Sequence, residues 1–148
     1  QLQPRIRNQN AILEIILNTA ARRCEQEAIQ LSLEIEDFPM DFLSDMDTTT
    51  IFSNLLDNAI DACMELDRSV KRIEVVLCQK MGLLALRMTN TCQAAADLSP
   101  RQWHSTKKDH MGIGLSNVRK TVEKYHGVVS VRTKEELFQV SVTIPIKS

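Results

Sequence analysis

Residues 47–67 read DTTTIFSNLLDNAIDACMELD, and this stretch combines a wide apolar surface with a compact group of short polar side chains. The apolar residues recur at helical spacing, which predicts a helix over the whole stretch. The polar group stands at positions i, i+3, i+4 and i+7, so its members share one helix face. They are Asn54, Asp57, Asn58 and Asp61.

The chemistry of this polar face is unusual for a helix. A solvated face is normally rich in Lys, Glu, Gln or Arg, whereas Asn and Asp form helix poorly because their short polar groups compete for the backbone. Carboxamide and carboxylate oxygens are ligands for a hard cation such as Mg²⁺. A ligand-binding face is therefore one interpretation, and an amphipathic helix with short polar residues facing water is the other.

Composition and charge narrow the class of protein. The chain has 148 residues, of which 43% are hydrophobic and 25% charged, as expected for one globular domain with a real core. The net charge of -1 gives no argument for binding nucleic acid. None of the four cysteines stands in a CxxC pair, so we expect no zinc site and a reducing, cytoplasmic setting.

Periodicity along the rest of the chain predicts the other elements. A helix is expected from about residue 10 to 24, an alternating strand at 29–36, a hairpin joined by residues 79–82, a helix after residue 112 and two closing strands. Ser44 and Asp47 resemble a capping box, and Gly127 is the expected helix stop.

These elements predict an α/β (α+β) two-layer sandwich, in which three helices cover one face of a mixed five-stranded sheet. We expect the domain to span residues 10–148. Residues 1–9 are expected to be a linker or the tail of an upstream helix. The chain begins with Gln1 rather than Met, which suggests a fragment of a longer protein.

A long stretch without clear period, residues 91–111, precedes a glycine motif. The stretch is basic in part, so it is either a lid over an anion or a solvated loop. Gly112 and Gly114 then open a helix, whose first N–H groups lack internal partners and suit phosphate. Together with the polar face upstream, the motif indicates a site for Mg²⁺ and a nucleotide.

The same residues carry a family resemblance. NLLDNAIDA at 54–62 resembles the N-box of the GHKL (Bergerat-fold) ATPases, and GIGLSNVRKTVEKYHG at 112–127 resembles the G2 box of bacterial sensor histidine kinases. The closing FQVSVTIP is similar to the last strand of that domain. Asn90, followed by Ser105, Thr106 and Lys107, is similar to the peptide-pheromone quorum-sensing kinases.

The resemblance implies roles for the polar face. Asn58 matches the asparagine that ligates Mg²⁺, and Asn54 matches the first N-box asparagine, near the phosphates and a second candidate for the metal. Asp57 matches the acidic position that polarises a water or the incoming nucleophile. Asp61 is either a neighbour of the nucleotide or merely solvated.

The resemblance also implies the contacts with ATP. Its phosphate cradle corresponds to Gly112, Gly114 and Leu115. Thr106 and Lys107 would reach ATP from the lid, Lys107 at the γ-phosphate, although a solvated lysine is the alternative. Asn90 would replace the aspartate that accepts a hydrogen bond from adenine, as a carboxamide oxygen also can. Because the glycine-rich motif that follows this aspartate in other kinases is missing, we expect weaker binding.

The implied function is the ATP-binding catalytic domain of a sensor histidine kinase. It would bind MgATP and transfer the γ-phosphoryl to a histidine on a separate dimerisation hairpin that this chain lacks, with a response regulator downstream. His104 and His110 fall in the lid and are not expected to be acceptors. We expect a homodimeric full-length receptor anchored in a bacterial membrane, and an isolated chain that is monomeric or weakly dimeric and does not autophosphorylate.

Two alternatives stay open. One is a serine kinase of the anti-sigma-factor type on the same fold, whose acceptor would lie on a partner protein. The other is a degenerate domain that serves only as an interaction module. The missing glycine-rich motif after Asn90 favours the module, whereas the intact pairs Asn54–Asn58 and Gly112–Gly114 oppose it.

Overall fold

The centre of the molecule is a five-stranded mixed sheet. A computed structural model describes residues 5–67, 70–93 and 112–146. Along the sheet the strand order is β1-β2-β3-β5-β4. β1 pairs with β2 in parallel, and the other pairs are antiparallel. The strands are β1 Gln30–Ile35, β2 Arg72–Lys80, β3 Leu83–Thr91, β4 Val128–Lys134 and β5 Leu137–Pro145.

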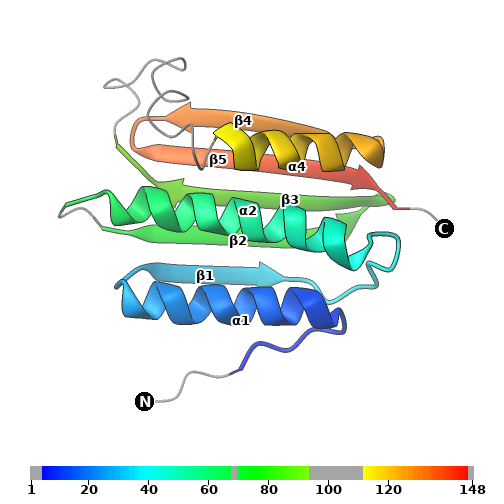
Figure 1. Cartoon of the computed structure of the whole chain (residues 1–148), viewed down its shortest axis with the longest axis horizontal. Helices are drawn as coiled ribbons and strands as arrows, with labels where there is room; N and C mark the ends of the chain where they lie inside the picture. The colour runs from blue at the N-terminus through cyan, green and yellow to red at the C-terminus, as the bar shows by residue number, and fades with distance from the viewer. Residues whose placement is uncertain (1–4, 68–69, 94–111, 147–148) are drawn as a thin grey trace.

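Helices cover one face of this sheet, as Figure 1 shows. Among the described residues they are α1 (Ala11–Gln26), α2 (Asp45–Met64) and α4 (Ile113–Lys124). α2 lies in the middle and contacts both of the others. The predicted two-layer sandwich with three helices on a mixed five-stranded sheet is confirmed, and its central helix is the one that carries the polar face.

Alternation along the strands builds the core. In β2, Ile73, Val75 and Leu77 are buried between exposed or half-buried neighbours, because successive side chains point to opposite faces of a sheet. The buried stripe of α1 ends at Cys24, and burial raises the pKa of the Cys24 thiol to about 11. A thiol in this setting packs as a small hydrophobe.

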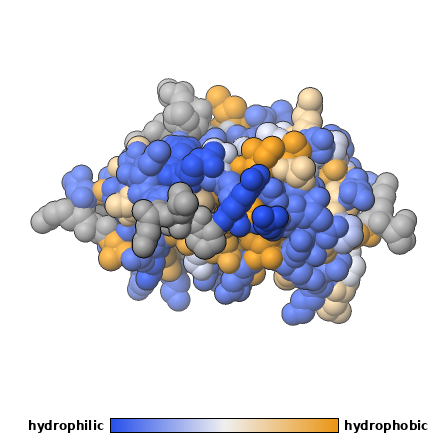
Figure 2. All heavy atoms as spheres, turned by 90° about the horizontal axis from the view of Figure 1, so that it is seen from below, coloured by the Kyte–Doolittle hydropathy of each residue, from blue (hydrophilic) through white to orange (hydrophobic). Residues whose placement is uncertain are grey.

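The described part of the chain has no candidate membrane span, and the face shown in Figure 2 is largely polar. No described helix has the length and apolar composition needed to cross a bilayer. Seen from the side of α1 and β1, the surface is mostly hydrophilic and its hydrophobic residues lie in small separate areas (Figure 2). Scattered apolar residues of this kind are normal on a protein surface.

The hairpin and the central helix differ slightly from the prediction. β2 and β3 are joined by Met81 and Gly82, both with positive φ (55° and 78°), which matches the twist of a tight hairpin. α2 ends at Met64 and not at residue 67. Its last turn tightens, since the N–H of Glu65 donates to the carbonyl of Ala62.

The end of α4 corrects one expectation. The residue with positive φ after this helix is His126 (φ 65°), not Gly127. Gly127 donates its N–H to the carbonyl of Val122, as in a Schellman motif. A Cβ at Gly127 would lie 2.4 Å from the carbonyl oxygen of Thr143, so this glycine is required for close contact with β5 rather than for the turn itself.

The start of α2 carries half of the predicted capping box. The hydroxyl of Ser44 accepts a hydrogen bond from the N–H of Asp47, as predicted. In a full capping box the Asp47 side chain would accept from the N–H of Ser44. Here the N–H of Ser44 donates instead to the hydroxyl of Tyr125, at the end of α4, and Tyr125 donates to the Asp47 carboxylate. The ammonium of Lys124 lies 2.8 Å from the same carboxylate. Burial would raise the pKa of Asp47, but hydrogen bonds from Lys124, Tyr125 and Ser44 outweigh it and lower that pKa.

Candidate functional site

The polar face of α2 is divided between two neighbouring helices. Asn54 and Asn58 lie against the first turn of α4, at Gly114. Asp57 and Asp61 lie toward α1, where both approach one arginine. The structure therefore does not gather the four predicted residues around one point: the two asparagines face α4, and the two aspartates face α1.

On the α4 side, the N-box and the glycine motif meet. A Cβ added at Gly114 would lie 3.2 Å from Oδ1 of Asn54 and 3.6 Å from Oδ1 of Asn58. Glycine therefore lets the first turn of α4 lie directly against two amide oxygens. Motifs that stand more than fifty residues apart in the sequence form one wall of the molecule.

The two asparagines differ in their hydrogen bonding. Asn54 is half-buried and donates from Nδ2 to the carbonyl of Thr50, 2.8 Å away and one turn earlier. Asn58 is only 5% exposed, and within residues 5–67, 70–93 and 112–146 its carboxamide has no hydrogen-bond partner. No fully buried side-chain nitrogen or oxygen among the described residues lacks a hydrogen-bond partner, so the Asn58 carboxamide stays within reach of solvent or a ligand.

The start of α4 supplies donors. Gly112, the N-cap residue, makes no side-chain cap, and the first N–H groups of a helix have no partner within the helix itself. The side chain of Leu115 is 6% exposed and belongs to the core. Any contact that Leu115 makes with a phosphate must therefore come from its backbone N–H.

This set of groups fits a nucleotide with its cation. The donors suit phosphate oxygens, and the amide oxygens suit Mg²⁺, which is usually held by few protein ligands together with substrate phosphates. No group of three His, Cys, Asp or Glu side chains able to hold a metal occurs in the described part of the chain. A Mg²⁺ ion at Asn58 would take its remaining ligands from phosphate oxygens and water.

On the α1 side, the groups are charged and open to solvent. Nη1 of Arg23 lies 3.1 Å from Oδ1 of Asp57, and Nη2 lies 3.9 Å from Oδ1 of Asp61. The side chains of Arg23 and Asp57 are 39% and 59% exposed. Arg23 belongs to α1 and was not among the predicted site residues, since no periodicity or motif in the sequence distinguishes it from the neighbouring Arg22.

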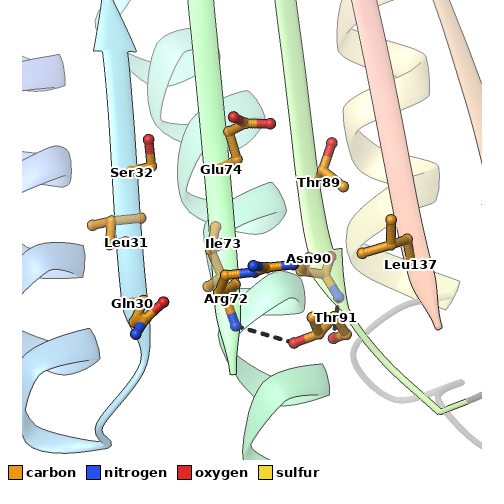
Figure 3. A pocket seen from close by; sticks show the side chains of 10 residues that line it. All are labelled: Gln30, Leu31, Ser32, Arg72, Ile73, Glu74, Thr89, Asn90, Thr91 and Leu137. Atoms are coloured by element: carbon orange, nitrogen blue, oxygen red, sulfur yellow. Dashed lines mark hydrogen bonds between the residues drawn. The ribbon is translucent and has the colours of Figure 1, made fainter. Parts of the chain in front are cut away.

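Asn90 occupies a different wall, in β3. It is 3% exposed, and its Nδ2 donates to the carbonyl of Thr91 at 2.9 Å, which leaves the carboxamide oxygen as an acceptor. Asn90 also borders a pocket of about 410 Å³ (Figure 3). Most of the side chains that line this pocket belong to the helix-free face of the sheet, Arg72 and Glu74 among them.

The pocket at Asn90 is distinct from the wall formed by the N-box and the glycine motif. Its lining includes neither Asn54 nor Asn58, and it includes neither Gly112 nor Gly114. The remaining predicted contacts lie in a segment that cannot be compared: Thr106 and Lys107, like Ser105, His104 and His110, fall outside the described residues.

Comparison with known proteins identifies the family of this domain. A model of the GHKL domain matches residues 43–145, which include α2, the glycine motif and all strands but β1. The comparison with curated protein sequences gave no match.

Solved structures share the fold along nearly the whole chain. The histidine kinase AdeS of Acinetobacter baumannii has a TM-score of 0.70 at 13% identity, over 100% of this chain and 70% of its own. The catalytic domain of histidine kinase ThkA has a TM-score of 0.68 at 16% identity, over 94% and 92%. The histidine kinase domain of the blue-light activated kinase EL346 from Erythrobacter litoralis has 0.67 at 14%, over 99% and 66%.

At these identities the structural likeness concerns the fold, which is that of histidine kinase catalytic domains. The family model covers well over half of the chain and includes both motifs that form the wall between α2 and α4. This chain therefore belongs to the GHKL domain family.

Proposed function

We propose that this chain is the ATP-binding catalytic domain of a two-component sensor histidine kinase, with MgATP bound between α2 and α4. One observation carries the proposal: the side-chain oxygens of Asn54 and Asn58 lie beside Gly114, at the start of α4, in a GHKL domain. Amide oxygens for a cation and backbone donors for phosphate then stand in one wall.

Each residue of the site has a role in this proposal. Asn58 ligates Mg²⁺, and Asn54 is the second candidate for that ion. The backbones of Gly112, Gly114 and Leu115 donate to the phosphates. Thr106 and Lys107 contribute from the lid, and the carboxamide oxygen of Asn90 accepts from adenine. When bound, Mg²⁺ offsets the negative charge of the phosphates, which is the main chemical demand of phosphoryl transfer.

Asp57 acts on the nucleophile rather than on the cation. In the proposed step, one imidazole nitrogen of the acceptor histidine forms a bond to the γ-phosphorus. The bond from that phosphorus to the bridging oxygen breaks, and its electron pair stays on ADP. The Asp57 carboxylate accepts the hydrogen bond, and then the proton, of the other ring nitrogen. Its exposure toward α1 leaves it accessible to a partner helix.

The finer assignments follow the sequence motifs. The acceptor histidine lies on a dimerisation hairpin outside this chain, residues 10–148 form the catalytic domain, and a response regulator acts downstream. Asn90 and the Ser105–Lys107 segment favour the peptide-pheromone quorum-sensing subfamily. The full-length protein is proposed to be a homodimeric, membrane-anchored bacterial receptor whose catalytic domain lies in the cytoplasm.

Calorimetric titration with ATP tests the nucleotide site. We expect binding to the native chain that requires Mg²⁺ and becomes about 100-fold weaker in Asn58→Ala, equivalent to about 2.7 kcal/mol. Thermal unfolding of Asn58→Ala should stay close to native, because its carboxamide has no partner in the described structure to lose. Thr49→Ala, an exposed change on the same helix, is the control for binding.

The outcomes separate the candidate functions. Absence of heat with the native chain at millimolar ATP would favour the interaction module. If the chain binds MgATP, a histidine hairpin and a serine-bearing partner of the anti-sigma-factor type are then supplied with labelled ATP. Label on the hairpin alone supports the histidine kinase, and label on the serine partner contradicts it. The isolated chain should take up no label.

A further inference from the structure

Arg23 contacts both acidic residues of the polar face of α2, although it lies in another helix. Its two terminal nitrogens approach Oδ1 of Asp57 at 3.1 Å and Oδ1 of Asp61 at 3.9 Å. Asp57 and Asp61 stand one turn apart on α2, so the planar guanidinium spans both. Arg23 lies outside residues 43–145, which match the GHKL domain model.

The position of Arg23 is held by packing on both sides of it. Ala20 and Cys24, three residues before and one after, are 5% and 1% exposed in the core. Leu17, one turn further back, is fully buried. The backbone at Arg23 is therefore anchored, and its side chain reaches across a groove of about 240 Å³ between α1 and α2, which Asp57 also lines.

The ion pair matters more for orientation than for stability. Asp57 is 59% exposed, and an exposed aspartate in a helix has several accessible rotamers. The positive guanidinium of Arg23 lies beside the Asp57 carboxylate and favours one orientation of it. Ion pairs this open to solvent contribute little to folding.

We propose that Arg23 is a positioning residue, which orients the Asp57 carboxylate at the rim of the α1–α2 groove for contact with the attacking histidine. The inference rests on the proposed function, in which Asp57 accepts the hydrogen bond of the acceptor imidazole. It adds a residue from α1 to the machinery and makes the packing of α1 on α2 part of the activity.

The test is phosphoryl transfer from MgATP to the histidine hairpin of the same protein, supplied in trans. We expect Arg23→Gln to lower kcat about 10-fold, as a misplaced catalytic group does, and to leave the KM for MgATP within about twofold. Arg23→Lys, which keeps the charge but lacks the planar fork, should recover only part of the lost rate. Arg22→Gln is the matched control, since Arg22 is exposed and precedes Arg23 directly.

A double-variant cycle decides whether Arg23 acts through Asp57. Asp57→Asn should lower kcat by itself, and Arg23→Gln should lower it no further in that background. Native kcat in Arg23→Gln, or an equal loss with and without the Asp57 carboxylate, would overturn the inference while MgATP binding stands. A native chain that binds no MgATP would overturn the proposed function and this inference with it.

Discussion

The two sides of α2 carry similar residue types but differ in burial and charge. Toward α4, the asparagines are uncharged and lie against a glycine, and Asn58 is almost fully buried. Toward α1, the aspartates are charged, more exposed, and paired with the end of a long side chain, Arg23. Close packing determines how the asparagine side chains lie on the α4 side, and the ion pair with Arg23 determines how the aspartate side chains lie on the α1 side.

This division has a simple geometric origin. Each residue of a helix turns by about 100°, so positions i, i+3, i+4 and i+7 spread over about 100° of its circumference. Helices that pack on opposite sides of α2 therefore each reach only part of that arc. The face that looks uniform in sequence becomes two surfaces, one of amide groups against α4 and the other of carboxylates beside α1.

The largest expected effect comes from breaking the close contact on the α4 side. Gly114→Val would push methyl groups into Asn54 and Asn58, and we expect a loss of about 2 kcal/mol in the free energy of unfolding together with a fall of more than about 100-fold in MgATP affinity. Chemical denaturation measures the free energy of unfolding, and calorimetric titration measures the MgATP affinity. For stability, Gly112→Val is the matched control, since a Cβ there meets no atom of the described residues within 4 Å. An equal loss in that variant would contradict the packing argument.

An intermediate effect is expected at the ion pair between Asp47, at the start of α2, and Lys124, at the end of α4. Asp47 is 6% exposed and bonded to Lys124 and Tyr125, so Asp47→Asn should cost about 2 kcal/mol at pH 7. The pKa of Asp47 is lowered from 3.8 in the folded state. Its contribution is therefore complete above pH 3.8 and is lost as the pH falls through the lower, folded-state value.

Denaturation curves from pH 7 to pH 3 check this prediction. The difference between native and Asp47→Asn should stay constant down to about pH 4 and shrink below it. Asp45→Asn, an exposed change in the same turn, should follow the native curve closely. A difference that shrinks already between pH 7 and pH 5 would show that another group is responsible.

The smallest effect on stability is expected at the ion pair on the α1 side. Arg23→Gln should change the free energy of unfolding by about 0.2 to 1 kcal/mol, because both partners are well exposed to solvent. The difference should nearly vanish in 1 M salt, where charges are screened within about 3 Å. A larger, salt-insensitive loss in denaturation would mean that Arg23 packs α1 onto α2, and would break the contrast between the two sides.

Much of the fold could be predicted from periodicity because the pattern of burial is local. The alternation of Ile73, Val75 and Leu77 and the stripe ending at Cys24 each depend only on which residues avoid water. The meeting of Asn58 with Gly114 could be predicted through the family resemblance, since it rests on two motifs in a known order.

Helix ends were harder to predict, because each depends on a distant contact. Gly127 is a good stop by composition, yet His126 makes the turn. The glycine is needed because a Cβ there would lie 2.4 Å from the carbonyl oxygen of Thr143 in β5. The hydroxyl of Ser44 caps α2 as predicted, but the N–H of Ser44 donates to Tyr125, at the end of α4, and not to Asp47. The sequence around a helix end does not say which side chain from another element will contact it in the fold.

The sequence by itself determined the class of the domain, its order of elements and the two motifs that meet between α2 and α4, because these follow from burial patterns and short motifs. Only the tertiary structure decided that Asn58 and Asp57, adjacent in the chain, serve different surfaces, and that Arg23 belongs with Asp57. The reason is physical: a side chain's environment is set by the helix packed beside it, and that neighbour is chosen by the whole fold.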